Sequence, residues 1–223
     1  MEIKKLGDTL EIAVERNLRV TVNDISFGMA CTPSNIEELI LGFMVTEGIA
    51  NPDGVKVTIN GENVEVIIED DAKVKITSSG SIGIEEGELK RVNAGEKFGI
   101  DELKSALEYL EVEEYKRTRG YHIAAVVSKK GLEARAYDVG RHNAVDKAVG
   151  MCIKKGIALD RTFLLISGRI SRGIAAKCVR AGIPLIVSKA AILDSAIELC
   201  RLTGLSAVSF ATNIAVKGDA LEI

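Results

Sequence analysis

The chain has 223 residues, of which 47% are hydrophobic and 27% charged, with a formal net charge of -3. The length permits one large domain or two small ones, and the absence of a basic excess argues against a general binder of nucleic acids or membrane surfaces. Aromatic residues make up 4% and tryptophan is absent, so stacking platforms for single-stranded nucleic acid are not expected.

The N-terminal part is expected to contain two strands and then a helix. Apolar and polar residues alternate over 9–15 and 19–24, which predicts half-buried strands. The period then becomes helical, and Ser34 with Glu37 fits a capping box at the start of this helix. Gly48 lies where a helix stop is expected. We therefore predict a helix of about three turns between Ser34 and Gly48.

A hairpin and a loop follow this helix. Residues 55–68 contain an Asn–Gly turn between two apolar–polar runs, which predicts a hairpin, and residues 73–77 predict a third strand. Residues 78–95 are rich in Gly and Ser and have no period, so we interpret them as a loop and a domain boundary. The expected domains are a small α+β subdomain at 1–97 and a core at 98–223.

The second half has a regular order of elements. The expected elements are a helix at 100–111, a hairpin at 122–128 and 132–137, helices at 141–155, 170–182 and 192–204, and strands at 162–167, 183–188 and 205–210. Two of these strands are nearly continuous apolar runs, which suits strands covered on both faces. The order predicts an α/β/α layered sheet that is mostly parallel at one side.

Basic residues follow three strands of this predicted sheet. Arg141 follows the hairpin, and Arg169 and Lys189 follow the next two strands. Helix N-termini begin at the same places and favour an anion, while Gly140 and Gly168 allow a ligand to approach the backbone closely. Arginine makes forked contacts with phosphate groups. The sequence therefore predicts a phosphate or pyrophosphate site at the carboxyl ends of the strands.

Other polar residues nearby have plainer interpretations when each is taken singly. His142 could cap a helix, and His122 could be a core histidine at the start of a strand. Asp138 is expected to cap the helix that begins near Arg141. Asp146 is next to Lys147 and is expected on a solvated face. Arg172 alone is best interpreted as solvated.

Several chemistries lack their sequence motifs. The zinc deaminase pattern H-x-E with P-C-x-x-C does not occur, and neither do the P-loop, dinucleotide-binding and nucleophile-elbow motifs. The four cysteines are far apart and form no C-x-x-C, so no protein-bound zinc is expected. With no apolar signal segment near the N-terminus and no run long enough for a membrane span, we expect a cytoplasmic protein with reduced thiols.

Five segments resemble the FdhD family, the formate dehydrogenase accessory proteins. They are YDVGRHNAVDKAVG at Tyr137–Gly150, LLISGRIS at Leu164–Ser171, KCVRAGIPLIVSKAA at Lys177–Ala191, CTPSNIEELILGFMVTEGI at Cys31–Ile49 and TRGYHIAAV at Thr118–Val126. The resemblance extends from about Thr32 to Phe210. The run D-V-G-R-H-N-A-V-D-K is highly specific.

The resemblance implies a fold, a function and a set of partners. Family members have a cytidine-deaminase-like α/β/α core without the zinc site, and a smaller, mainly β N-terminal subdomain. They are cytoplasmic homodimers that receive sulfur from a cysteine desulfurase. They pass this sulfur to the molybdenum cofactor before the cofactor enters formate dehydrogenase. The transient ligand is a molybdopterin guanine dinucleotide in its molybdenum or tungsten form, or a guanine nucleotide, and its pyrophosphate suits the predicted anion site.

Motif matching and the strand ends together give the candidate cofactor-binding residues. These are His122, Gly140, Arg141, His142, Asn143, Ser167, Gly168, Arg169, Ser188 and Lys189. No nucleic-acid or membrane partner is expected.

One departure from the family concerns sulfur transfer. Family members carry a C-x-x-C in a loop of the form T-S-S-C-G-x-C-G, whereas Thr77–Gly83 here is TSSGSIG. A sulfur carrier needs a thiolate, and serine cannot hold sulfane sulfur. Cys31 is the best-placed remaining thiol, because it precedes a predicted helix start where a thiolate is favoured.

Three functions follow in order of preference. The first is binding of the cofactor and its delivery to a formate dehydrogenase-like enzyme. The second is the family's sulfurtransferase activity, through a remaining thiol or a partner's thiol. The third is a zinc-independent enzyme for a nucleotide-like substrate, with His122 and His142 as acid and base.

Overall fold

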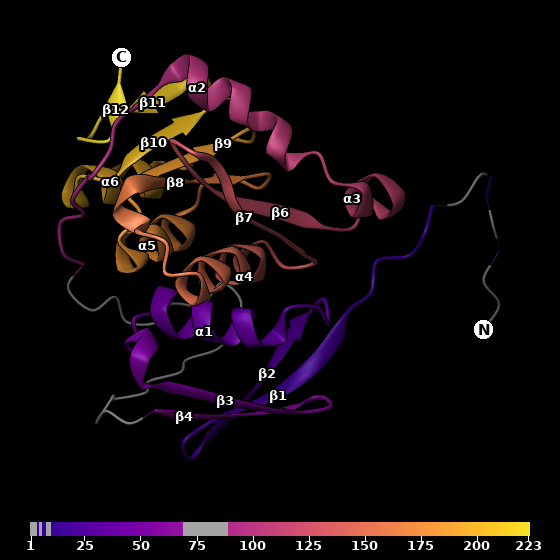
Figure 1. Ribbon diagram of the computed structural model, residues 1–223. Coiled ribbons are helices and arrows are strands. Elements are labelled where there is room, and N and C mark those ends of the chain that lie inside the picture. The colour runs from indigo at the N-terminus through magenta and orange to yellow at the C-terminus, as the bar shows by residue number, and fades with distance from the viewer. Residues whose placement is uncertain (1–3, 5, 8–9, 69–88) are drawn as a thin grey trace.

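The protein consists of two α/β units that meet along a pair of helices (Figure 1). The computed structural model describes residues 4, 6–7, 10–68 and 89–223. We call the described residues 16–68 the small unit and 89–223 the large unit. Within the described ranges, no helix combines the length and the apolar character needed to cross a lipid bilayer.

The small unit is a four-stranded sheet covered on one face by a helix. Its elements are β1 (Arg16–Val22), β2 (Ile25–Cys31), α1 (Ile36–Thr46), the short 3-10 helix η1 (Pro52–Gly54), β3 (Val55–Asn60) and β4 (Asn63–Ile68). The strand order is β2-β1-β4-β3, with β1 and β4 parallel and the other pairs antiparallel. Alternate residues of β1 and β4 are buried against α1, as the period-2 pattern of their sequences requires.

Three sequence predictions for the small unit need correction. Residues 10–15 form no strand, and the backbone N–H of Val14 donates to Tyr121 Oη in the large unit at 2.9 Å. Strand β2 was not predicted, because its glycine and alanine have low strand propensity. The capping box at α1 is wrong: Asn35 is the N-cap residue, with a left-handed φ of 53° and no side-chain cap bond. Ser34 Oγ instead lies 3.5 Å from Lys147 Nζ.

The large unit contains a six-stranded sheet in the order β11-β10-β9-β8-β6-β7. The strands are β6 (His122–Ser128), β7 (Gly131–Asp138), β8 (Thr162–Ile166), β9 (Leu185–Ser188), β10 (Ser206–Ser209) and β11 (Ile214–Val216). Strands β8, β9 and β10 are parallel, whereas β6 is antiparallel to both β7 and β8. This mixed sheet agrees with the prediction, and it places the carboxyl ends of β7, β8 and β9 at one end of the sheet.

Helices cover both faces of this sheet (Figure 1). One face carries α4 (Arg141–Lys154), η3 (Leu159–Arg161), α5 (Arg172–Ala181) and α6 (Asp194–Thr203), and the other carries β5 (Phe98–Gly99), α2 (Ile100–Ser105), η2 (Ala106–Leu110) and β12 (Leu221–Glu222). The predicted helix at 100–111 is thus α2 continued by a 3-10 turn. Helix α3 (Glu113–Thr118) was not predicted. The predicted strand at 73–77 and most of the 78–95 loop lie outside the described residues, so the domain boundary stays a prediction.

The two units meet where helices α1 and α4 come into backbone contact. A Cβ added at Gly42 would lie 1.8 Å from the carbonyl oxygen of Asp146, and one added at Gly150 would lie 2.0 Å from that of Glu38. Backbone atoms cannot move aside as a flexible side chain can. Two glycines, one on each helix, therefore set how closely the units approach.

Replacing Gly42 by alanine tests this contact. Helix propensity alone would make Gly42→Ala stabilising by about 1 kcal/mol, but the overlap with Asp146 should instead lower the free energy of unfolding by about 1–3 kcal/mol. Urea unfolding measures the difference. Gly54→Ala is the control, because a Cβ at Gly54 meets no atom within 4 Å. A more stable Gly42→Ala protein would contradict the close contact.

Candidate functional site

Three of the predicted site residues lie close together at the carboxyl ends of β7 and β8, where β6 begins. His122 begins β6, Arg141 begins α4 after β7, and Gly168 follows β8. A Cβ added at Gly168 would lie 3.4 Å from His122 Nδ1 and 3.5 Å from both Cβ and Cδ of Arg141. Arg169, the next residue, is exposed. We call His122, Arg141, Gly168 and Arg169 the arginine edge.

Arg141 has a donor that no other described residue accepts. Its Nε is buried and, among the described residues, it is one of two buried side-chain nitrogen or oxygen atoms without a hydrogen-bond partner. The other is Ser206 Oγ. Leaving a buried donor unpaired costs about 1–3 kcal/mol, more for a charged group. An acceptor supplied by a ligand would remove that penalty.

The helices that begin at this end of the sheet favour an anion. None of α4, α5 and α6 has a side-chain hydrogen bond at its N-cap. Helices α4 and α5 have no acidic residue in the first turn and begin with Arg141 and Arg172. A cation at a helix N-terminus is electrostatically unfavourable. A bound anion would interact favourably with both the arginines and the helix dipoles.

Both histidines are held in the neutral form near pH 7. Burial lowers the pKa of His142 to about 4, and the positive charges of Lys177 and Arg141 add to this effect while Glu47 opposes it. Burial and the Arg141 charge also lower the pKa of His122, against the influence of Asp138. The imidazoles can therefore donate or accept hydrogen bonds, but the positive charge of the arginine edge comes from its arginines.

Two predicted serines shape the loops around Gly168. Ser167 Oγ accepts the N–H of Ile123 at 2.9 Å, and the Ser167 N–H donates to the Ile123 carbonyl at 2.9 Å. Ser188 Oγ donates to the Gly168 carbonyl at 2.6 Å and accepts the N–H of Ala190 at 2.9 Å. These bonds fix Gly168 against β6 and β9. The serines thus hold the backbone of the arginine edge.

Lys189 makes an ion pair with Glu111, which follows η2 on the other face of the sheet. Its Nζ lies 3.7 Å from Glu111 Oε1, and the two side chains are 44% and 57% exposed. An exposed ion pair of this kind contributes little to stability. The structure therefore places Lys189 beside an acidic partner rather than in contact with Arg141.

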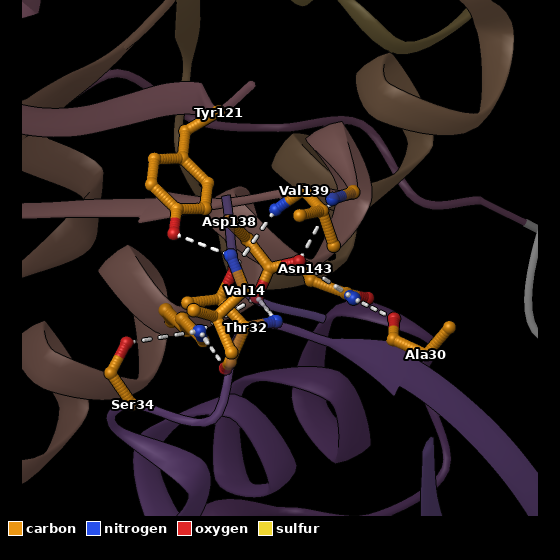
Figure 2. Close-up of polar contacts among 10 residues, drawn as sticks. Val14, Ala30, Thr32, Ser34, Tyr121, Asp138, Val139 and Asn143 are labelled. Atoms are coloured by element: carbon orange, nitrogen blue, oxygen red, sulfur yellow. Dashed lines mark hydrogen bonds and ion pairs between the residues drawn. The ribbon is translucent and has the colours of Figure 1, made fainter. Parts of the chain in front are cut away.

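The carboxylate of Asp138, three residues before Arg141, is buried. Asp138 is 0% exposed and ends β7 (Figure 2). Its Oδ2 accepts Lys147 Nζ at 2.6 Å and the Thr32 N–H at 3.0 Å. Its Oδ1 accepts the Gly140 N–H at 2.8 Å and Asn143 Nδ2 at 3.1 Å. The Asp138 carboxylate therefore connects the turn before α4 to the small unit.

These contacts correct one expectation: Asp138 is not the N-cap of α4, because Gly140 occupies that position. Asn143, predicted in the cofactor pocket, directs its amide nitrogen to Asp138 and to the Ala30 carbonyl at 2.8 Å, and its contact with a cofactor stays a prediction. Lys147 is fully buried and also donates to the Thr32 carbonyl at 2.8 Å.

Asp146 is also buried, in a second polar cluster between the units. Its Oδ1 accepts Thr46 Oγ1 at 2.6 Å and Lys177 Nζ at 2.8 Å. Lys177 also pairs with Glu47, which lies 3.5 Å from Arg180 Nη1. Burial raises the pKa of Asp146 to about 6, while Lys177 acts in the opposite direction. The predicted solvated face of Asp146 is therefore wrong.

A sequence signal for these buried charges was present. Asp146 and Lys147 are flanked on both sides by apolar pairs, Ala144–Val145 and Ala148–Val149, so they stand in a mainly apolar part of α4. Consecutive helix positions point about 100° apart. One side chain therefore reaches α5 and the other reaches the segment between β2 and α1.

All four cysteines lie within the described residues, and each is buried. Cys31 is the last residue of β2 and belongs to the core of the small unit. Burial raises its pKa to about 11, with Asp138 adding to the effect and Lys147 opposing it. Burial likewise raises the pKa of Cys152 and of Cys200 to about 12, and that of Cys178 further still.

The thiolate predicted at Cys31 is therefore not favoured by its surroundings. The expectation assumed a helix start, whereas α1 begins five residues later in the chain at Ile36. The stretch Thr77–Gly83, which contains no cysteine, lies outside the described residues.

Comparison with known proteins gives the family. The fold and site define a mixed α/β protein of two units, with arginines and helix N-termini gathered at one end of its larger sheet. The model of the FdhD/NarQ family matches residues 13–217. The chain belongs to the FdhD/NarQ family.

Curated relatives match nearly the whole chain. It is 30% identical to the "Sulfur carrier protein FdhD" of Listeria innocua, over 95% of this chain and 88% of the relative. It is 28% identical to the protein of the same name from Geobacillus kaustophilus, over 96% and 87%. A crystal structure from Desulfotalea psychrophila, assigned as a formate dehydrogenase accessory protein, has a TM-score of 0.75. It covers 89% of this chain and 84% of its own at 22% identity, which shows the fold.

Thiol accessibility can be measured directly. We expect Ellman's reagent to leave the native protein unreacted over the time in which the urea-unfolded chain reacts at all four cysteines, because a buried thiol is neither accessible nor ionised. Cys31→Ser should not change the native result. Rapid reaction of one native thiol would contradict the burial.

The pH dependence of stability tests the surroundings of His142. As the pH falls below 6.5, the unfolded chain takes up a proton on this histidine, but the folded protein does so only near its pKa of about 4. Stability should therefore fall between pH 6.5 and pH 4, by on the order of 2 kcal/mol from this group. The difference between the urea-unfolding curves of the wild type and His142→Gln isolates the effect. If the free energies of unfolding of the two proteins changed equally between pH 6.5 and pH 4, His142 would titrate normally in the folded protein.

Proposed function

We propose that this chain binds a molybdopterin guanine dinucleotide-type cofactor at the arginine edge and delivers it to a formate dehydrogenase-like enzyme. The observation that carries the proposal is the buried Nε of Arg141, which has no hydrogen-bond partner among the described residues and belongs to a side chain close to Gly168. The pyrophosphate of the cofactor would accept from Arg141 and Arg169. The family of the chain and the printed description of its structural neighbour support the choice of enzyme partner.

The donors at the arginine edge suit a pyrophosphate better than a single carboxylate. Arginine offers a planar fork of N–H donors that matches phosphate oxygens. Arg141 is half-buried and Arg169 is exposed, so one can act deep in the site and the other at its rim. The N-termini of α4 and α5 add backbone donors of the same kind. Because Gly168 has no side chain, it leaves room for a ligand oxygen beside Arg141.

The alternative is sulfur transfer from a cysteine desulfurase to the molybdenum cofactor. The names of the curated relatives favour it. The chemistry requires an accessible thiolate that becomes a persulfide. Each of the four cysteines of this chain is buried, and burial raises its pKa. The two loop cysteines of the family are absent from Thr77–Gly83. Delivery without sulfur carriage on this chain is therefore the function that its residues support best.

Four finer points stay predictions from the sequence. They are the cytidine-deaminase-like character of the large unit, the homodimer, the cytoplasmic location and the cysteine desulfurase as a partner. The metal of the cofactor, molybdenum or tungsten, is equally a prediction.

Calorimetry with guanosine diphosphate, which carries the guanine and pyrophosphate of the cofactor, tests the proposal. The wild type should bind, and Arg169→Ala should weaken binding by about 1.5–3 kcal/mol, or about 10- to 100-fold, because charge-assisted contacts are lost. Arg201→Ala is the matched control, since Arg201 is an exposed arginine at the C-terminal end of α6. Absence of any guanine nucleotide binding by the wild type would refute the proposal.

Intact-mass spectrometry separates delivery from sulfur carriage. The protein is incubated with a cysteine desulfurase, pyridoxal phosphate and free cysteine, beside a known carrier as a positive control. We expect no added sulfur on this chain, because its thiols are inaccessible. A gain of one sulfur atom that is removed by reduction would favour the sulfurtransferase alternative and identify the thiol.

A further inference from the structure

We infer that the small unit positions Arg141 for anion binding through Thr32 and Asp138, neither of which contacts the ligand. The inference rests on the proposed function, because it concerns how the same site is held. It assigns a role to two buried polar residues on opposite sides of the interface between the units. It also explains why a binding site in the large unit depends on the small unit.

The Asp138 carboxylate has partners in both units: Oδ1 binds residues around Arg141, and Oδ2 binds one residue of the small unit and one of α4. Oδ1 accepts the Gly140 N–H and the Asn143 amide, which lie on either side of Arg141 and His142 in the chain. Oδ2 accepts the Thr32 N–H of the small unit and the Lys147 ammonium. A shift of the small unit would therefore move the turn that carries Arg141.

Thr32 makes a second contact with the same turn. Its Oγ1 accepts the N–H of Val139 at 3.1 Å, while its own N–H donates to Asp138. The Asn143 amide also donates to the Ala30 carbonyl. The backbone before Arg141 is thus bonded to the segment that joins β2 to α1, and the side chain of Asn143 is bonded to β2 (Figure 2).

The turn has little freedom to adapt to a displacement. Gly140 is packed so closely that an added Cβ would lie 3.0 Å from Asn143 Nδ2. Arg141 in turn touches Gly168, whose carbonyl is held by Ser188. Binding sites lose affinity when their groups move by more than about 0.5 Å from the productive geometry. Loss of the Thr32 contact should therefore weaken binding without removing any group that touches the anion.

The second polar cluster provides a matched control. Thr46 is buried like Thr32, and across the interface its Oγ1 donates to Asp146 and accepts from Lys177. Asp146 lies in the second turn of α4, away from the turn that precedes Arg141. Thr32→Val and Thr46→Val each remove one hydroxyl from the same interface between the units. Only the first removes a contact with the backbone that carries Arg141.

The experiment compares the two variants in the full chain. Urea unfolding should show a loss of stability for both variants, at least as large for Thr46→Val, because its hydroxyl has two buried partners. Calorimetry with inorganic pyrophosphate and with guanosine diphosphate should show at least a fivefold higher Kd for Thr32→Val and a change of less than twofold for Thr46→Val. Thr32→Ser keeps the hydroxyl and should bind like the wild type.

A double-mutant cycle tests whether Thr32 acts through Arg141. In an Arg141→Ala background, adding Thr32→Val should cause no further loss of affinity, because the group that Thr32 positions is absent. Equal losses in the two threonine variants, unchanged binding by Thr32→Val, or a Thr32 effect that persists without Arg141 would each overturn the inference. Failure of the wild type to bind either probe would instead refute the proposed function, and the positioning role with it.

Discussion

The arrangement of the two units depends on the buried ion pair between Asp138 and Lys147. Both side chains are fully buried and their charged atoms are 2.6 Å apart. Moving two charges out of water costs several kcal/mol each, and this is offset only when hydrogen bonds satisfy the remaining lone pairs and protons. Here the carboxylate accepts three further bonds, and the ammonium donates to the Thr32 carbonyl. The pair therefore requires both units to be in place.

Helix α4 connects the contacts between the two units to the candidate site. Its first residue is Arg141, its middle turns carry Asp146 and Lys147, and Gly150 rests on the backbone of α1. A helix is rigid over this length, since each backbone N–H is bonded to the carbonyl four residues earlier. The contacts that fix the position of α4 against α1 therefore also fix the direction in which the Arg141 side chain leaves the sheet.

The sequence predicted the regular parts of this protein well, because burial periodicity is a local property. The apolar runs of β8 and β9 and the amphipathic pattern of α4 each follow from neighbouring residues. The small-unit partners of Asp146 and Lys147 did not follow, because Thr46 and Thr32 lie 100 and 115 residues away, in α1 and the segment before it. A charged residue in a helix is ordinarily solvated, and only the tertiary contact overrides that expectation.

The candidate site was predictable to a similar extent. The rule that ligands bind at the carboxyl ends of parallel strands brought Arg141, Gly168 and Arg169 together correctly in one region. The role of Asn143 was not predictable, because its side-chain partners include a carbonyl of β2, a strand that the sequence pattern did not reveal. The surroundings of Cys31 were not predictable for the same reason. The sequence pattern placed Cys31 just before a helix start, whereas it is the last residue of β2.

Anion binding and sulfur carriage depend on different parts of this protein. The arginine edge is held by backbone turns, two serines and the Asp138 carboxylate, and no thiol is among these contacts. Sulfur carriage depends on a reactive thiolate, which the sequence of Thr77–Gly83 no longer supplies. Among the described residues, the hydrogen bonds that hold the arginine edge involve no cysteine side chain. Anion binding at this edge would therefore not require a thiol, whereas sulfur carriage would.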